Sequence, residues 1–320
     1  MHFPREPCRT IRCDGKNVIL NNTDKQDIIK NVESIINVAA IVKHYGNKDI
    51  FYDINLYGTQ KIIEFCNLYK KKLVHISTIS VSGNMLEASQ LSQEKILEST
   101  DFDETKLYIN QNLDNIYIYT KFLAEREILE AITNGLDAKI IRVGNLTGRY
   151  SDGKFQTNIE ENAFIGRLLS FAKIGYIPKE LTNFYLEFSP VDLTADAIIE
   201  ICKMNIDRNV FHVYNNKHVE IDKFLNIIDK YGININIVSS EEMKKILKAN
   251  IDKKSAAING ILYDINEKME FMYQNNIKIK GDFTNQILEK SGFIWKEIDE
   301  QYIYKFLIKI GIIEEGKNGI

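Results

Sequence analysis

Short apolar runs alternate along this chain with segments of helical pattern. Residues 34–37, 73–77 and 138–143 have the composition of buried strands, and residues 49–69 and 116–133 between them have that of helices. A strand that reaches the next through a helix lies parallel to it. The alternation therefore predicts an α/β fold, a Rossmann-like parallel sheet with helical crossovers. Ligands of such sheets bind at the carboxyl ends of the strands.

The second half of the chain is more helical, with short strands expected near 210–213 and 235–238. We expect an incomplete Rossmann-like domain over residues 17–205. A smaller, mostly helical part over residues 206–320, interleaved with 147–190, would bind the substrate or a carrier protein. No low-complexity linker separates the two parts, so we expect them to share one interface.

The first sixteen residues differ in composition from the rest. Three of the eight arginines, two of the four prolines and two of the four cysteines lie within residues 1–13. We expect residues 1–16 to be unstructured or foreign to the fold. A fusion junction, a frame-shifted start, an added expression sequence or a plain disordered tail would each explain them.

Charge and composition exclude several classes of function. The net charge of -3 gives no sign of a nucleic-acid partner or an anionic membrane. No apolar run approaches 18 residues and no leader pattern is present, which predicts a cytoplasmic protein without a membrane span. The five histidines lack ligand spacing with Cys, acidic or other His residues, so no metal is expected.

A tyrosine and a lysine four residues apart share one helix face. In a carbonyl-reducing site the Tyr hydroxyl can donate a proton, the ammonium can lower the Tyr pKa, and a Ser or Thr hydroxyl can bind the same oxygen. The chain has three such pairs, Tyr57/Lys61, Tyr117/Lys121 and Tyr150/Lys154. Tyr57 lies on an earlier crossover helix and Tyr150 in a Gly/Asp-rich loop. Tyr117 lies on the helix that follows the strand ending at Thr78 and precedes the strand 138–143. Thr78 could instead simply cap a turn at the strand end.

Several stretches together carry a family resemblance: residues 35–46, 55–59, 75–83, 117–125, 141–149, 189–192, 292–295 and 302–310. In combination they resemble the extended short-chain dehydrogenase/reductase superfamily. More specifically, the chain is similar to the thioester reductase domains that end many nonribosomal peptide synthetases. The resemblance runs from about residue 17 to the end.

The resemblance implies a catalytic triad of Thr78, Tyr117 and Lys121. It implies that hydride passes from NADPH to an acyl thioester on a phosphopantetheine carrier, which is released as an aldehyde or an alcohol. The phosphopantetheine-bearing carrier protein would be the partner. The cofactor-binding residues that the resemblance implies are Ala39, Ala40, Tyr117, Lys121, Val143 and Asn145.

One part of the family pattern is missing, the first strand with its G-x-x-G-x-x-G turn. Gly15 is the only glycine before Gly46. In the usual strand order the two missing strands lie between the third and the fourth, which would be residues 18–20 and 34–37 here. Either residues 18–20 move across to pair with 34–37, or a bare edge results. The fold is therefore expected to be N-terminally truncated and its cofactor binding impaired.

Two other functions remain open from the sequence. A nucleotide-sugar epimerase or dehydratase of the same superfamily uses the same triad. A non-catalytic, truncated remnant that only contacts a carrier protein would explain the missing glycine turn.

Overall fold

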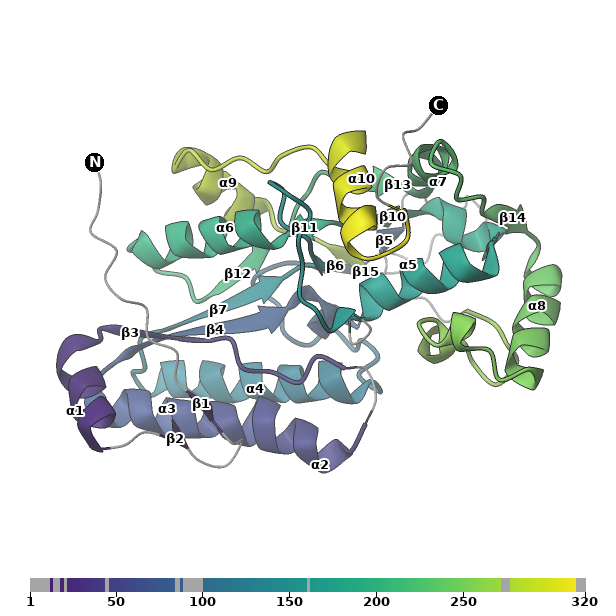
Figure 1. Cartoon of the computed structure of the whole chain (residues 1–320). Helices are drawn as coiled ribbons and strands as arrows, with labels where there is room; N and C mark the ends of the chain where they lie inside the picture. The colour runs from purple at the N-terminus through teal and green to yellow at the C-terminus, as the bar shows by residue number, and fades with distance from the viewer. Residues whose placement is uncertain are drawn as a thin grey trace.

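The structure is a computed structural model that describes residues 12–13, 18–19, 22–43, 46–83, 87–88, 100–159, 162–271 and 277–314. Figure 1 shows a central sheet between helical layers, with a second group of helices and short strands beside it.

A parallel sheet of four strands forms the centre of the molecule (Figure 1). Its order is β12 (Val210–Val213), β7 (Ala138–Val143), β4 (Lys72–Thr78) and β3 (Ser34–Asn37). Each neighbouring pair is parallel, so all four carboxyl ends reach the same edge. The predicted Rossmann-like sheet is thereby confirmed.

Helices cover both faces of this sheet, which explains why its strands read as continuous apolar runs. Leu73 and Ile140 face one side and pack with the buried side chains of α3 (Gly58–Tyr69) and α4 (Ile116–Thr133). Their neighbours Val74 and Ile141 face the other side, where α6 (Val191–Lys203) and α9 (Asp282–Lys290) lie. Successive strand residues alternate between faces, so each strand contributes to two cores.

One long helical rod leads from the end of β3 to the start of β4. It consists of α2 (Lys48–Phe51), the π-helical η1 (Tyr52–Tyr57) and α3, and it covers the helix predicted over residues 49–69. The side chain of Asn47 accepts from the N–H of Asp49 and so starts the rod. Lys70 ends it in the left-handed conformation.

The short strand near the start of the chain lies outside the parallel sheet. β2 (Val18–Ile19) pairs antiparallel with β1 (Arg12–Cys13), and α1 (Asn22–Asn31) follows. The idea that this strand moves across to pair with β3 is therefore wrong, since its hydrogen bonds go to residues 12–13. Within the described part of the chain, β4 is the one strand that pairs with β3. The rest of the segment expected to be unstructured, residues 1–11 and 14–16, lies outside the described residues.

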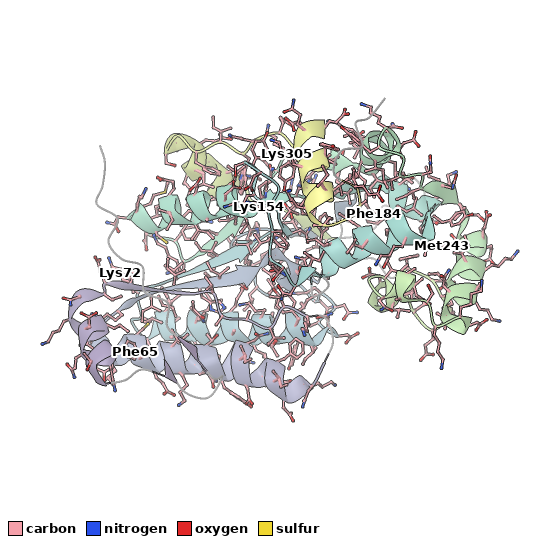
Figure 2. The ribbon with its side chains drawn as sticks, in the orientation of Figure 1. Phe65, Lys72, Lys154, Phe184, Met243 and Lys305 are labelled. Carbon is pink, nitrogen blue, oxygen red and sulfur yellow. The ribbon has the colours of Figure 1, made fainter. Side chains whose placement is uncertain are left out.

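A second unit packs beside the sheet, with its own core. Figure 2 shows Phe184 and Met243 in this unit, whereas Phe65 and Lys72 lie at the far end of the sheet. Its elements are α5 (Ala163–Ile174), β9 (Tyr176–Pro178), η4 (Lys179–Asn183), β10 (Phe184–Leu186), β13 (Val219–Glu220), α7 (Ile221–Asp229), β14 (Asn236–Val238), α8 (Ser240–Asp252), η5 (Ala256–Ile258), η6 (Leu262–Asp264) and α10 (Glu300–Lys309).

The two units exchange segments along the chain. Side chains of residues 164–188 share one apolar core with those of residues 219–313. β12, which lies past the expected boundary at residue 205, completes the parallel sheet. Short strand pairs also form outside the parallel sheet: β8 (Leu146–Thr147) with β11 (Ser189–Pro190), β6 (Thr100–Phe102) with β15 (Ile277–Ile279), and β5 (Glu87–Ala88) with β10.

Candidate active site

Thr78 is the last residue of β4, at the carboxyl edge of the sheet. Its side chain is buried, and its Oγ1 accepts from the N–H of Ser80 at 3.1 Å. It thereby caps the 3-10 helix η2 (Ile79–Ser82). Thr78 also lies near enough to Tyr117 to lower the pKa of its phenol. The strand-end hydroxyl thus caps a turn, and it also reaches the candidate tyrosine.

Tyr117 lies in the first turn of α4. Oδ1 of Asn115 accepts from the N–H groups of Tyr117 and Ile118 at 3.0 and 3.2 Å, so the helix start is fixed at this point. Burial raises the pKa of Tyr117 to about 12, and the neighbouring Thr78 hydroxyl acts in the opposite direction. The phenol is therefore protonated near neutral pH and can donate a proton.

Lys121 follows Tyr117 by one helical turn, and its side chain is fully buried. Its Nζ donates to the carbonyl oxygen of Ile76 at 2.7 Å and lies 2.9 Å from Nε2 of His75. Burial lowers the pKa of Lys121 to about 8, and the charge of Glu125 opposes this shift. The expected lowering of the Tyr117 pKa is not seen, because burial outweighs other influences on the phenol and Nζ is directed at β4.

The two other Tyr/Lys pairs do not combine with a strand-end hydroxyl in this way. Tyr57 is 47% exposed on η1, and Lys61 pairs with Glu64. Tyr150 stacks on Tyr302 in the second unit. Tyr117/Lys121 is thus the pair that the fold brings to the carboxyl edge.

The residues expected near a cofactor lie at the carboxyl ends of two strands, β3 and β7. Ala39 and Ala40 follow β3, while Val143 ends β7 and Asn145 lies two residues further. The N–H of Asn145 donates to Oε2 of Glu187 at 2.5 Å. Glu187 is a buried carboxylate that the sequence did not single out, because its partner comes from a different segment.

The backbone beside β3 offers little to a cofactor diphosphate. The N–H of Ala39 already donates to Oδ1 of Asn37 at 3.2 Å, and that of Ile41 to Oδ1 of Asn55 at 2.8 Å. Residues 22–43 contain no glycine at which a phosphate could approach the backbone closely. The described residues therefore form no glycine-rich cradle for the phosphates of a nicotinamide cofactor.

Gly144 is required by the close approach of Glu187. A Cβ at this position would lie 2.5 Å from Oε2 of Glu187 and 2.7 Å from Cβ of Tyr214. Glu187 cannot retreat freely, since it also accepts from Oγ of Ser189 at 2.5 Å.

We expect Gly144→Ala to lower the free energy of unfolding by about 1–3 kcal/mol, as overpacking does in tight sites. Denaturant unfolding measures it. Gly166→Ala is the control, because its Cβ would meet its nearest atom, Cα of Gly260, at 3.4 Å in ordinary contact. Equal stability of the Gly144 variant and the wild type would contradict the tight packing around Glu187.

A buried ionic network lies beneath the site. Arg142 donates to both oxygens of Glu125, at 2.7 Å from Nη2 to Oε2, and Ser77 donates to Oε1 of the same carboxylate. Nη1 of Arg142 lies 3.0 Å from Nε2 of His212, whose Nδ1 lies 2.7 Å from the carbonyl oxygen of Lys280. The network joins β4, α4, β7 and β12 near the carboxyl ends of the strands.

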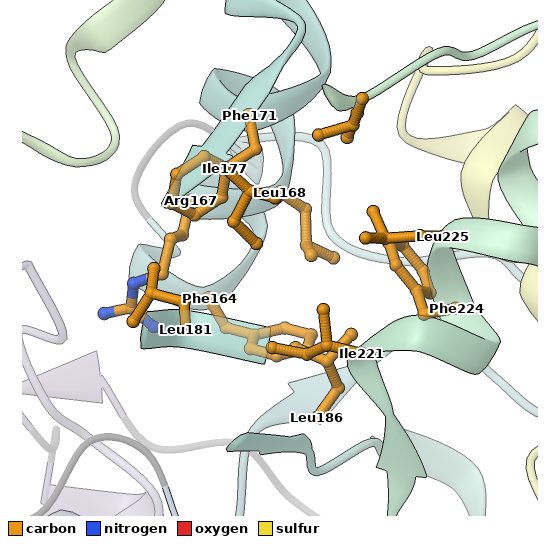
Figure 3. A pocket seen from close by; sticks show the side chains of 11 residues that line it. Phe164, Arg167, Leu168, Phe171, Ile177, Leu181, Leu186, Ile221, Phe224 and Leu225 are labelled. Carbon is orange, nitrogen blue, oxygen red and sulfur yellow. The ribbon is translucent and has the colours of Figure 1, made fainter. Parts of the chain in front are cut away.

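An apolar pocket, called here the cavity, lies in the second unit (Figure 3). Phe164, Leu168 and Phe171 of α5 line one side, and Phe224 of α7 lies on another. The single charged side chain at its wall, Arg167, is paired with Asp264. Leu186 of β10 also lines the cavity and is followed directly by Glu187, which contacts Asn145.

The described residues contain neither a cluster of metal-ligating side chains nor a membrane-spanning helix. In that part of the chain, no three His, Cys, Asp or Glu side chains gather as a metal ion would require. No helix among the described segments is long and apolar enough to cross a bilayer.

The fold is that of an α/β domain of the extended short-chain dehydrogenase/reductase class. Residues 13–198 match an NAD-binding family model described as male sterility protein, and the chain belongs to this family.

A thiolation-reductase di-domain from an archaeal non-ribosomal peptide synthetase has a similar structure. It is 33% identical with a TM-score of 0.75, and the match covers 90% of this chain and 59% of that one.

The curated relatives include reductases. A putative fatty acyl-CoA reductase of Drosophila melanogaster is 22% identical over 196 residues, which is 55% of this chain and 37% of that protein. The L-2-aminoadipate reductase large subunit of Candida glabrata is 26% identical over 250 residues, 75% of this chain and 18% of that protein. The chain spans well under two thirds of the length of these relatives.

Proposed function

We propose that this chain is an NADPH-dependent reductase that releases an acyl or peptidyl thioester from a phosphopantetheine carrier as an aldehyde or alcohol. The observation that supports this is the proximity of the Thr78 and Tyr117 side chains at the carboxyl end of β4, with Lys121 one turn along α4. Two hydroxyls that meet at one point can both bind a single carbonyl oxygen.

The proposed chemistry depends on these hydroxyls. NADPH, when bound, supplies the hydride to the thioester carbonyl carbon. Tyr117 remains protonated, because its pKa is raised to about 12, and donates to the oxygen as negative charge develops there. Thr78 provides a second donor, and both are already in place before the reaction. Collapse of the tetrahedral thiohemiacetal then releases the aldehyde and the carrier thiol.

In this proposal the cofactor lies across the carboxyl edge. Lys121, Val143 and Asn145 would hold its nicotinamide end, and Ala39 and Ala40 would lie beside its diphosphate or adenosine. Because the N–H of Ala39 is already bonded to Asn37, we expect weaker binding than a glycine-rich turn provides. The activity of this chain alone is therefore proposed to be impaired.

The substrate is proposed to be an apolar acyl thioester. The cavity of the second unit supports this, because its walls are apolar and its one cation is neutralised by Asp264. Leu186 of the cavity wall is adjacent in sequence to Glu187, which holds the backbone of Asn145. Relatives that act on fatty acyl-CoA and a structure that joins a thiolation and a reductase domain agree with a thioester substrate on a carrier protein.

The test combines cofactor binding with turnover. We expect NADPH fluorescence to change on titration with the purified chain, and octanoyl-CoA or an octanoyl-loaded carrier protein to yield octanal or octanol. UDP-glucuronic acid serves as the control and should remain unchanged. Turnover of the sugar nucleotide would favour an epimerase, and failure to bind NADPH would favour a non-catalytic module.

A further inference from the structure

His75 connects Lys121 to the strand end that carries Ala39. It lies on β4 and is fully buried. Its Nε2 is 2.9 Å from Nζ of Lys121, and its Nδ1 is 3.1 Å from Nδ2 of Asn37. Oδ1 of Asn37 in turn accepts from the N–H of Ala39 at 3.2 Å. One chain of hydrogen bonds therefore runs from the buried amine to the backbone beside β3.

The donors and acceptors along this chain fix the proton positions. An amide nitrogen only donates, so Nδ1 of His75 accepts from Asn37 and the imidazole proton is on Nε2. That N–H is directed at Nζ of Lys121. An ammonium has no lone pair with which to accept it, so this arrangement requires Lys121 as a neutral amine, which still donates to Ile76.

A second arrangement follows when Lys121 takes up one proton. The ammonium donates to Nε2 of His75, so the imidazole proton must be on Nδ1. The amide of Asn37 then has to turn its oxygen towards Nδ1, and this rotation removes the acceptor of the Ala39 N–H. The two arrangements differ by one proton in total, and His75 is neutral in both.

We propose that His75 is a positioning residue that couples the charge of Lys121 to the orientation of the Asn37 amide and to the availability of the Ala39 N–H. Its part in catalysis rests on the proposed function, in which Lys121 and Ala39 both lie along the cofactor. An anion that accepts from Ala39 would favour the ammonium form, and by linkage the ammonium would favour the anion.

The surroundings of Lys121 and His75 allow the change to occur near neutral pH. Burial and the neighbouring Lys121 hold the pKa of His75 well below its usual range, so the imidazole stays neutral. The pKa of Lys121 is lowered to about 8 by burial, against the charge of Glu125, which Arg142 neutralises. The phenol of Tyr117 stays protonated. The ionisable group that changes is therefore Lys121.

The side chains that complete the surroundings are neutral. Asn55 of the π-helical stretch donates to Oγ1 of Thr120 at 3.0 Å, and Thr59 of α3 lies 3.5 Å from Nδ2 of Asn37. Neither titrates, so neither adds a second pH-dependent step.

Nitrogen-15 NMR of the whole chain with labelled histidine tests the coupling without cofactor or substrate. From about pH 6 to about pH 10 we expect His75 to change from mainly the Nδ1–H to mainly the Nε2–H tautomer, with a midpoint near the Lys121 pKa. The variant His75→Phe lacks the His75 signal, so the missing resonance identifies it in the wild-type spectrum. A single tautomer for His75 throughout this range would overturn the proposal, whether or not the chain reduces thioesters.

One internal control and two variants test whether Lys121 and Asn37 set the His75 tautomer. His212 is the internal control, since its Nε2 accepts from the guanidinium of Arg142, which has donors only, and its Nδ1–H donates to the carbonyl oxygen of Lys280. Its tautomer should be constant. Lys121→Met should make the His75 tautomer independent of pH, and Asn37→Asp should hold it as Nδ1–H. A His75 change that persists in Lys121→Met would assign the transition to another group and overturn the coupling.

Discussion

Tyr117→Phe is expected to lower the rate of thioester reduction by about a hundredfold or more, as loss of one oxyanion donor does, while the fold remains intact. The phenol lies beside Thr78 and is protonated near neutral pH, so it is the donor that the developing oxyanion would meet. Phenylalanine keeps the ring and removes only this hydroxyl. NADPH consumption with octanoyl-CoA under single-turnover conditions measures the effect, and thermal unfolding checks the fold.

Tyr119→Phe is the matched control for this experiment. Tyr119 lies on the same helix two residues away and is 36% exposed, so its hydroxyl lies on a different face from that of Tyr117. Its loss should leave the rate near that of the wild type. Equal rates for the wild type and Tyr117→Phe would show that the proton comes from another group, and the site assignment would be lost.

The central sheet could be predicted from the sequence because its signals are local. Residues 138–143 and 210–213 are short apolar strands buried on both faces, and residues 116–133 form a helix that Asn115 starts. These patterns depend on neighbours a few residues apart, so periodicity detects them. The meeting of Thr78 and Tyr117 followed from topology, since both flank the carboxyl edge of one strand.

The contacts that distinguish this site could not be predicted, because they join distant segments. Lys121 was expected to lower the Tyr117 pKa, but its amine contacts His75, 46 residues earlier in the chain. Glu187 reaches Asn145 from 42 residues away. The antiparallel pairing of residues 18–19 with residues 12–13 also depends on a partner that composition had marked as foreign. Spacing specifies which residues share a helix face, but not which acceptors the fold brings to them.

The ionic network below the site yields the largest expected change in stability. Arg142 and Glu125 have side chains exposed by 1% and 0%, and they are joined at 2.7 Å. We expect Glu125→Leu to lower the free energy of unfolding by about 3–5 kcal/mol, because it leaves a guanidinium buried without its partner. The hydroxyl of Ser77 loses its acceptor in the same variant. Urea unfolding followed by circular dichroism measures the loss.

Two further variants show how much of the loss in stability comes from the unpaired buried charge. Glu64→Gln removes the partner of Lys61 in an exposed pair and should cost less than about 1 kcal/mol. The double variant Glu125→Leu with Arg142→Met removes both buried charges, so it should recover part of the stability that Glu125→Leu loses. If the double variant were less stable than Glu125→Leu, packing and the bond from Arg142 to His212 would outweigh the unpaired charge. The network would then act mainly as a scaffold between β7 and β12 rather than as a neutralised ion pair.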